Sequence, residues 1–194
     1  LICGFKTKIS ADEYTKHLEA KTLEEILYFM KVSKNDTIFM PSGVVHSIGP
    51  GILLTEIQQA SDITYRIYDW NRKDAEGNSR ELHVELAKDV INYDACSNCL
   101  IKSNSISNKP SIINTNPYFT TNELIINKKI ERDYSSIDSF IIYICITGDI
   151  EIQYSGGIEH LKAGETMLIP ACLESIALNP STECKLLEVY IENS

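Results

Sequence analysis

The sequence is poor in positive charge and has no long apolar segment. Its 18 Lys and Arg residues are outnumbered by 27 Asp and Glu residues, so the formal net charge is -9. A nucleic-acid partner is therefore not expected, because phosphate binding needs clustered cations. No apolar run reaches the roughly 18 to 20 residues that cross a bilayer, and no charged segment followed by an apolar one opens the chain. We expect a soluble, cytoplasmic protein with no membrane partner.

The cysteines lack a second closely spaced pair. Of the six cysteines, only Cys96 and Cys99 have motif spacing. A zinc ribbon needs two such pairs, so this single pair is a weak signal for a metal. Most of the other cysteines lie in apolar strand-like runs, where a reduced thiol behaves as a small hydrophobe. We expect free thiols, with a disulfide or an adventitious metal as the alternative.

A polar lead-in and an initiator Met are absent as well. The segment Leu1 to Phe5 already reads as an apolar strand, which predicts further sequence upstream. A barrel that lacks its early strands has unpaired edges, and we expect an apolar wall around Phe5, Phe39 and Ile52. A homo-oligomer formed through this edge, or another covering segment, is the corresponding expectation.

Helix signals are concentrated in the first half of the chain. Ser10 and Glu13 have the spacing of a capping box, which predicts a helix to about Ala20. A similar run from Thr22 to Glu25 predicts a second helix, whose apolar stripe extends to Met30. Apolar residues at helical spacing predict a third helix over residues 80–91, which would connect two halves. Short strands are expected at residues 37–40, 52–56 and 63–68.

The second half reads as a domain of short strands. Turns such as Thr147-Gly-Asp149 separate them at the intervals of a sandwich or barrel. The predicted fold is mainly β, with two jelly-roll barrels, the first incomplete and the second without a metal. Residues 1–93 would form the first domain with its helical insert, and residues 94–194 the second. After a polar linker with one strand, the strands are expected at residues 118–127, 139–147, 151–154, 165–170, 174–178 and 184–191.

A proline and glycine turn before His46 is the most informative local pattern. The run is Pro41-Ser-Gly-Val-Val-His46, and such a turn between β-rich segments can aim an imidazole at a metal. In the following segment, an alternating pattern places Glu56 and Gln58 on one face of a strand. The second half has a weak repeat of this pattern with Ser175 where the first has His46. Chemistry is therefore expected in the first half.

Pro41-x-Gly-x-x-His46 resembles the second half of the cupin signature, which belongs to a jelly-roll barrel. The fuller pattern continues with Gly49-Pro-Gly51, then Glu56-Ile-Gln-Gln-x-Ser-Asp-x-Thr-Tyr-Arg66-x-Tyr-Asp-Trp-x-Arg72, then Arg80-Glu-Leu-His83. This longer pattern is similar to the type I mannose-6-phosphate isomerase family in its short bacterial form. The resemblance is dense over residues 1–93 and thin from there to the end.

The resemblance implies a zinc-dependent isomerase that interconverts mannose 6-phosphate and fructose 6-phosphate. His46 matches a metal ligand, Arg66 the catalytic arginine and Glu56 a carboxylate that shuttles protons, while Arg72 is the candidate for the substrate phosphate. The family's other metal ligands come from an earlier segment that this chain does not contain. One imidazole does not make a zinc site, so the resemblance implies a C-terminal portion, and its activity alone stays an open question.

Plain structural roles stand beside each of these assignments. Arg66 could pair with Asp62 or Asp69, Glu56 could be a hydrogen-bonding residue of the barrel wall, and Arg72 could form a salt bridge. His83 is expected to be a packing or capping residue of its helix. Two other functions remain open, a non-catalytic sugar-binding or regulatory cupin and an iron-dependent cupin dioxygenase.

Overall fold

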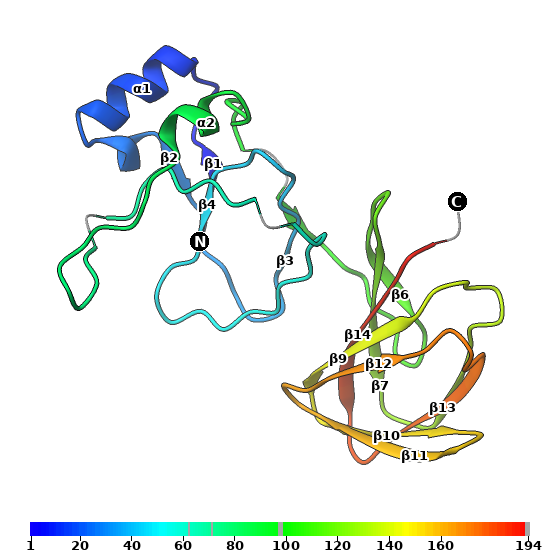
Figure 1. Cartoon of the computed structure of the whole chain (residues 1–194). Coiled ribbons are helices and arrows are strands. Elements are labelled where there is room, and N and C mark those ends of the chain that lie inside the picture. The colour runs from blue at the N-terminus through cyan, green and yellow to red at the C-terminus, as the bar shows by residue number, and fades with distance from the viewer. Residues whose placement is uncertain (62, 71, 97–98, 193–194) are drawn as a thin grey trace. The chain divides into compact units, whose positions relative to one another are not determined.

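The protein has two compact units, residues Leu1–Ile101 and Lys102–Ser194. The structure is a computed structural model of the chain (Figure 1), and it describes residues 1–61, 63–70, 72–96 and 99–192. The first unit extends past the boundary expected after Tyr93, because its last segment pairs with its own strands. Ala95 bridges Phe5, and strand β5 (Leu100–Ile101) pairs with β3 (Thr37–Ile38).

The second unit consists of two antiparallel sheets, as the mainly β, jelly-roll prediction requires. One sheet has the strand order β11-β10-β13-β8 and the other the order β12-β9-β14-β7-β6. Buried and partly exposed residues alternate along β9, β10 and β14, so each sheet turns one apolar face inward. The strands are β6 (Ser111–Thr115), β7 (Thr120–Ile126), β8 (Ile130–Asp133), β9 (Ile141–Thr147), β10 (Asp149–Tyr154), β11 (Gly157–Lys162), β12 (Thr166–Ile169), β13 (Ser175–Pro180) and β14 (Cys184–Tyr190).

All six strands expected in the second half are present, with ends that differ by a few residues. The prediction omitted β8 and β11, whose sequences are polar. In β11 only Leu161 is buried, since the strand lies at a sheet edge and pairs only with β10. An edge strand needs little apolar surface, so its sequence carries a weak strand signal.

The first unit is smaller and less regular. Its three-stranded sheet has the order β2-β1-β4, where β1 is Ile2–Phe5, β2 is Leu27–Phe29 and β4 is His46–Ser47. The buried core beside it consists of Ile2, Phe5, Tyr14, Leu23 and Leu27. Phe5 is fully buried and stacks on Tyr93, so the predicted exposure of Phe5 is wrong, whereas Phe39 is exposed and Ile52 is partly exposed.

Helix α1 (Ala11–Glu19) begins as the sequence predicts. The Glu13 amide donates to Ser10 Oγ at 3.2 Å, and the Ser10 amide donates to Glu13 Oε2 at 2.8 Å. These two bonds satisfy amides that the first helical turn leaves free. The capping box is therefore confirmed.

Four other elements of the first half differ from the prediction: the second and third helices and the two strands expected at residues 52–56 and 63–68. The second helix is only a 3-10 turn, η1 (Leu23–Glu25), because the apolar residues after it form β2 and pair with β1. The third helix is limited to α2 (Val84–Lys88). The described residues between 48 and 69 form no strand, and Leu53 and Ile63 are 100% and 67% exposed. A strand needs a partner for its backbone groups, and none of the described strands pairs there.

Candidate functional site

The turn that leads to His46 is fixed by close backbone contacts. Gly43 has a φ of +83°, and a Cβ at this position would lie 2.5 Å from the Val90 carbonyl oxygen. The Asn92 amide donates to the Gly43 carbonyl at 2.9 Å. Only glycine allows this backbone conformation and this approach. The glycine of the motif therefore docks the turn against the segment that follows α2.

His46 lies on β4, directly opposite Cys3 of β1. Its side chain is exposed, and Nδ1 lies 2.9 Å from the Val44 carbonyl oxygen. A carbonyl only accepts, so in the neutral ring this contact places the proton on Nδ1 and leaves Nε2 with a lone pair. Metal-binding histidines often have this arrangement. The ring is thus prepared to act as one ligand.

A complete metal site at His46 is not present among the described residues. In these residues, the one group of at least three His, Cys, Asp or Glu side chains with converging ligand atoms is Cys3, Cys96 and Cys99. Catalytic zinc sites take three protein ligands. The described part of this chain therefore does not fit a catalytic zinc ion around His46 by itself.

Arg66 is held by its backbone and by its guanidinium. The Arg66 amide donates to His83 Nδ1 at 3.2 Å, and the His83 amide donates to the Arg66 carbonyl at 2.8 Å. Arg66 Nη1 donates to the Glu81 carbonyl at 3.4 Å. His83 is therefore a packing residue that orders the backbone of Arg66, in agreement with the expected structural role. Asp62, one partner considered for Arg66, lies outside the described residues.

Arg72 pairs with the other carboxylate considered for Arg66. Its Nε donates to Asp69 Oδ1 at 3.1 Å, its Nη2 donates to the same oxygen, and the guanidinium lies 5.7 Å from the Trp70 ring centroid. Asp69 is buried, whereas the Arg72 side chain is mostly exposed. Because the carboxylate uses Nε and Nη2, Arg72 Nη1 has no hydrogen bond to a described residue and can bind a ligand.

Glu56 is exposed in a segment without regular structure. Its carboxylate makes no hydrogen bond or ion pair to any described residue. Within the same residues, no such interaction joins His46, Glu56, Arg66 and Arg72 to one another. The structure thus places all four predicted residues in the first unit and leaves their mutual arrangement as a prediction.

Three thiols form a cluster that the sequence analysis did not assemble. Cys3 Sγ lies 3.2 Å from Cys96 Sγ, and Cys96 Sγ lies 2.6 Å from Cys99 Sγ. Cys3 is buried, and burial raises the pKa of its thiol and that of Cys96. The pair Cys96 and Cys99 was visible as a motif, whereas Cys3 is 93 residues from Cys96 and gave no signal. The residues between the pair, Ser97 and Asn98, lie outside the described part of the chain.

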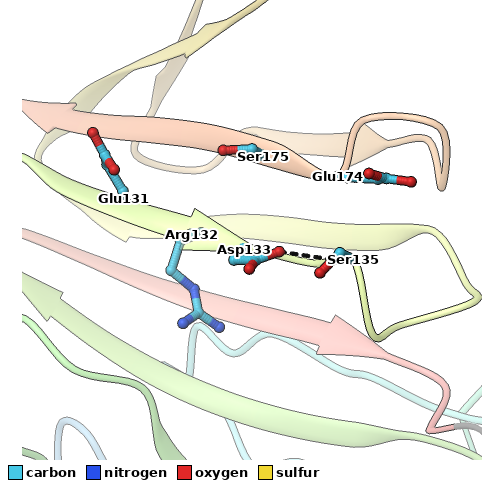
Figure 2. A pocket seen from close by; sticks show the side chains of 6 residues that line it. All are labelled: Glu131, Arg132, Asp133, Ser135, Glu174 and Ser175. Carbon is cyan, nitrogen blue, oxygen red and sulfur yellow. Dashed lines mark hydrogen bonds between the residues drawn. The ribbon is translucent and has the colours of Figure 1, made fainter.

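An open pocket of about 390 Å³ lies on the second unit beside β8 and β13. Figure 2 shows that Arg132 turns away from the carboxylates of the pocket, and its guanidinium pairs with Glu188. The remaining charges of the lining are all negative, so the pocket does not suit a phosphate. Its lining consists of Glu131, Arg132, Asp133, Ser135, Glu174 and Ser175.

Comparison with known proteins gives consistent matches. The chain is 32% identical over 187 residues to the mannose-6-phosphate isomerase ManA of Bacillus subtilis and 29% identical over 179 residues to the mannose-6-phosphate isomerase of Streptococcus mutans. The crystal structure of the mannose 6-phosphate isomerase from Bacillus subtilis superposes with a TM-score of 0.84 at 28% identity, over 98% of this chain and 60% of that chain.

These matches cover most of this chain but only part of the relatives. The two curated relatives are matched over 89% and 90% of this chain, and the chain spans 55% of the length of each. No protein-family model matches the sequence. No described helix is both long and apolar enough to cross a membrane.

Proposed function

We propose that this chain, which is homologous to the mannose-6-phosphate isomerases over about 90% of its length, acts in the interconversion of mannose 6-phosphate and fructose 6-phosphate. The observation that carries this proposal is the agreement of sequence and fold with the Bacillus subtilis enzyme over 98% of the chain. Because the chain spans only 55% of each curated relative, the activity of the whole enzyme is part of the proposal.

The reaction requires proton transfer between two neighbouring carbons of the sugar. It proceeds through an enediol, so negative charge develops on the oxygens at C1 and C2. We assign the stabilisation of this charge to the guanidinium of Arg66, since a fixed cation at a developing oxyanion lowers the barrier. Glu56 is the proposed group that accepts and returns the proton. Its exposed segment would have to close over the substrate to reduce the access of water.

Arg72 is the proposed phosphate-binding residue. Asp69 and Trp70 contact its guanidinium, and the Arg72 side chain stays mostly exposed. A guanidinium held in this way loses little conformational entropy when it binds a phosphate dianion, and its planar fork matches the phosphate oxygens. The arrangement therefore favours Arg72 as the anchor for the anionic end of the substrate.

We further propose zinc as the metal and His46 as one ligand, through Nε2. When bound, the ion would polarise the oxygens of the sugar carbonyl and hydroxyl as a Lewis acid. Among the described residues, His46 belongs to no group of three converging ligand side chains. Zinc binding at His46 is thus a property to be tested in a protein of the full length of the relatives.

The test measures isomerase activity in two proteins. One is this chain supplied with zinc, and the other is a chimaera in which this chain replaces the matching segment of the Bacillus subtilis enzyme. We expect the chimaera to form fructose 6-phosphate from mannose 6-phosphate, and Arg66→Ala to lower kcat by roughly 100- to 1000-fold. Lys73→Ala is the matched control, an exposed cation of the neighbouring loop, and should retain activity. A folded, zinc-loaded chimaera that forms no ketose would contradict the proposal.

A second candidate function is binding of a sugar phosphate without turnover. It is favoured by the exposed position of His46 and by the absence of a complete ligand set beside it among the described residues. Calorimetric titration of the folded chain with mannose 6-phosphate separates the two functions. Binding that depends on Arg72, together with an inactive but folded chimaera, would favour the binding protein over the enzyme.

A further inference from the structure

Three thiol sulfurs from two distant parts of the sequence converge in the first unit. Cys3 lies on β1, whereas Cys96 and Cys99 follow α2 near the end of the unit. All three sulfurs lie within 4.8 Å of one another. The thioether sulfur of Met40 lies 3.8 Å from Cys3 Sγ, so a fourth sulfur borders the cluster.

The backbone fixes these positions. The Cys96 amide donates to the Phe5 carbonyl at 2.9 Å, and the Phe39 amide donates to the Cys99 carbonyl at 2.9 Å. Gly4 has a φ of +68°, and a Cβ there would lie only 3.1 Å from Cys96 Cβ. Glycine thus permits both the backbone conformation of β1 and the approach of the Cys96 segment. The thiols are positioned by the fold and not by chance contact of mobile side chains.

We propose that Cys3, Cys96 and Cys99 bind one soft d10 metal ion as thiolates, with Zn²⁺ as the first choice and Cu⁺ as the alternative of the same ligand chemistry. Thiolate sulfur selects these ions over Mg²⁺ or Ca²⁺, which prefer oxygen. Sulfurs at about 2.3 Å from a tetrahedral zinc ion are about 3.8 Å apart. The observed separations of 3.2 Å and 2.6 Å are shorter than this, so the sulfurs would move apart to hold the ion.

The ion would join the first strand of the unit to its last segment. This link closes a loop of more than 90 residues between Cys3 and Cys96, and metal-binding free energy adds to the folding free energy where the site exists only in the folded chain. The long segment without regular structure lies between these two points. The bound ion would therefore stabilise the whole first unit.

His46 lies opposite Cys3 in the sheet register, yet its ring atoms are not part of the converging group. Nδ1 is occupied by the Val44 carbonyl. The proposed site therefore uses the three thiolates and leaves His46 out. This separation makes the test independent of the proposed isomerase function.

The test titrates the reduced, metal-free chain with Co²⁺ under anaerobic conditions and follows the thiolate-to-cobalt charge-transfer band. We expect one ion per chain, displacement by Zn²⁺, and a higher unfolding midpoint of the first unit from Trp70 fluorescence. Cys99→Ser should weaken binding by more than about 100-fold, since even residues behind a ligand contribute about 10- to 100-fold. Cys3→Ser is a second variant. Cys3 is buried, so its substitution is more prone to disturb folding than Cys99→Ser, and the two variants are therefore measured together.

Two control variants keep the proposal falsifiable. Cys172→Ser removes an exposed cysteine of the second unit and should leave the band unchanged, and His46→Gln should do the same. A competition with Cu⁺ on wild type and Met40→Leu identifies the ion, because a thioether contributes to Cu⁺ and not to Zn²⁺. The assignment would be overturned if the charge-transfer band is absent, if His46→Gln abolishes it, or if it persists in both Cys99→Ser and Cys3→Ser. A disulfide between Cys96 and Cys99 in the freshly isolated protein would also overturn it.

Discussion

The two units differ in how they treat buried polar groups. In the second unit, the carboxylate of Glu188 is completely buried and accepts hydrogen bonds from Arg132, Asn122, Tyr134 and Tyr143. In the first unit, Tyr14 Oη and Asp69 Oδ2 are buried with no hydrogen-bond partner among the described residues, whereas the second unit has one such atom, Asn122 Oδ1. A satisfied network specifies one packing arrangement, whereas an orphaned polar atom lowers stability.

This difference between the units agrees with the location of the proposed functional residues, which lie in the first unit. The second unit fills the interior of its sandwich with its own side chains, so its core is a structural scaffold. The first unit has the four predicted site residues, the thiol cluster and a long irregular segment. Functional residues are often located on such less ordered segments beside a rigid scaffold. The comparison therefore predicts that substitutions of buried polar residues lower the free energy of unfolding most in the second unit. In the first unit, some substitutions should have little effect and others should raise the stability.

The largest expected effect is that of Glu188→Ala. Two bonds from the Arg132 guanidinium, at 2.9 Å each, would be lost, and that charge would remain largely buried. Removal of one partner from a buried ion pair destabilises a protein by roughly 3–5 kcal/mol. Urea unfolding followed by far-ultraviolet circular dichroism should show this loss.

Glu131→Ala is the control, because Glu131 lies next to Arg132 on β8 and is exposed. It should change the free energy of unfolding by less than about 0.5 kcal/mol. Fluorescence of Trp70, the single Trp of the chain, reports the first unit separately. If Glu188→Ala shifts the Trp70 transition as much as the circular dichroism transition, the two units do not unfold independently.

A smaller effect is expected at Gly43. Gly43→Ala forces a φ of +83° on an L residue and places its Cβ 2.5 Å from a carbonyl oxygen. Backbone strain and overpacking together should lower the stability of the first unit by roughly 2–4 kcal/mol. Gly164 of the second unit has a similar φ of +86° but open space around its Cβ. Gly164→Ala should therefore cost only the strain, roughly 1 kcal/mol.

These two measurements use different probes for the two units. Trp70 fluorescence measures the unfolding of the Gly43→Ala variant, and far-ultraviolet circular dichroism measures the unfolding of the Gly164→Ala variant. Equal losses for both glycines would mean that the contact with Val90 is not important. The glycine of the motif would then be explained by its turn conformation alone.

Local sequence patterns predicted the elements that depend on neighbouring residues. The capping box at Ser10 and the strands β7, β9 and β14 follow from patterns within a few residues, and all are present. Long-range pairing was not visible. The local pattern predicts a helix at Leu27–Phe29 because its strand partner β1 is distant in sequence, and tertiary pairing overrides local propensity.

The same limit applies to the candidate site. The turn with Gly43 and the Cys96 and Cys99 pair could be identified from spacing alone. The contribution of Cys3 to the cluster depends on the Phe5 and Ala95 bridge, which no local pattern encodes. Glu188 is detectable in principle as the one acidic residue of the largely apolar strand β14, but its partner Arg132 lies on β8, a strand whose polar sequence gives no signal.

The smallest expected effect, and one of opposite sign, is that of Tyr14→Phe. Tyr14 lies on α1, is fully buried and packs edge-on against Phe5 and Tyr93. Its hydroxyl has no described partner, so its removal relieves a desolvation cost. We expect the first unit to become more stable by roughly 1 kcal/mol. Tyr143→Phe in the second unit should instead be destabilising, because that hydroxyl donates to the Glu188 carboxylate.

The pH dependence distinguishes this explanation from a simple packing effect. Burial raises the pKa of Tyr14 from 10.0 to about 12. The unfolded chain loses this proton near pH 10 while the folded chain keeps it, so the contribution to stability is constant below pH 10 and is lost between pH 10 and about pH 12. Tyr14→Phe should remove this part of the alkaline decline in the Trp70 transition. An unchanged decline in the variant would show that Tyr14 ionises as readily in the folded chain as in the unfolded one.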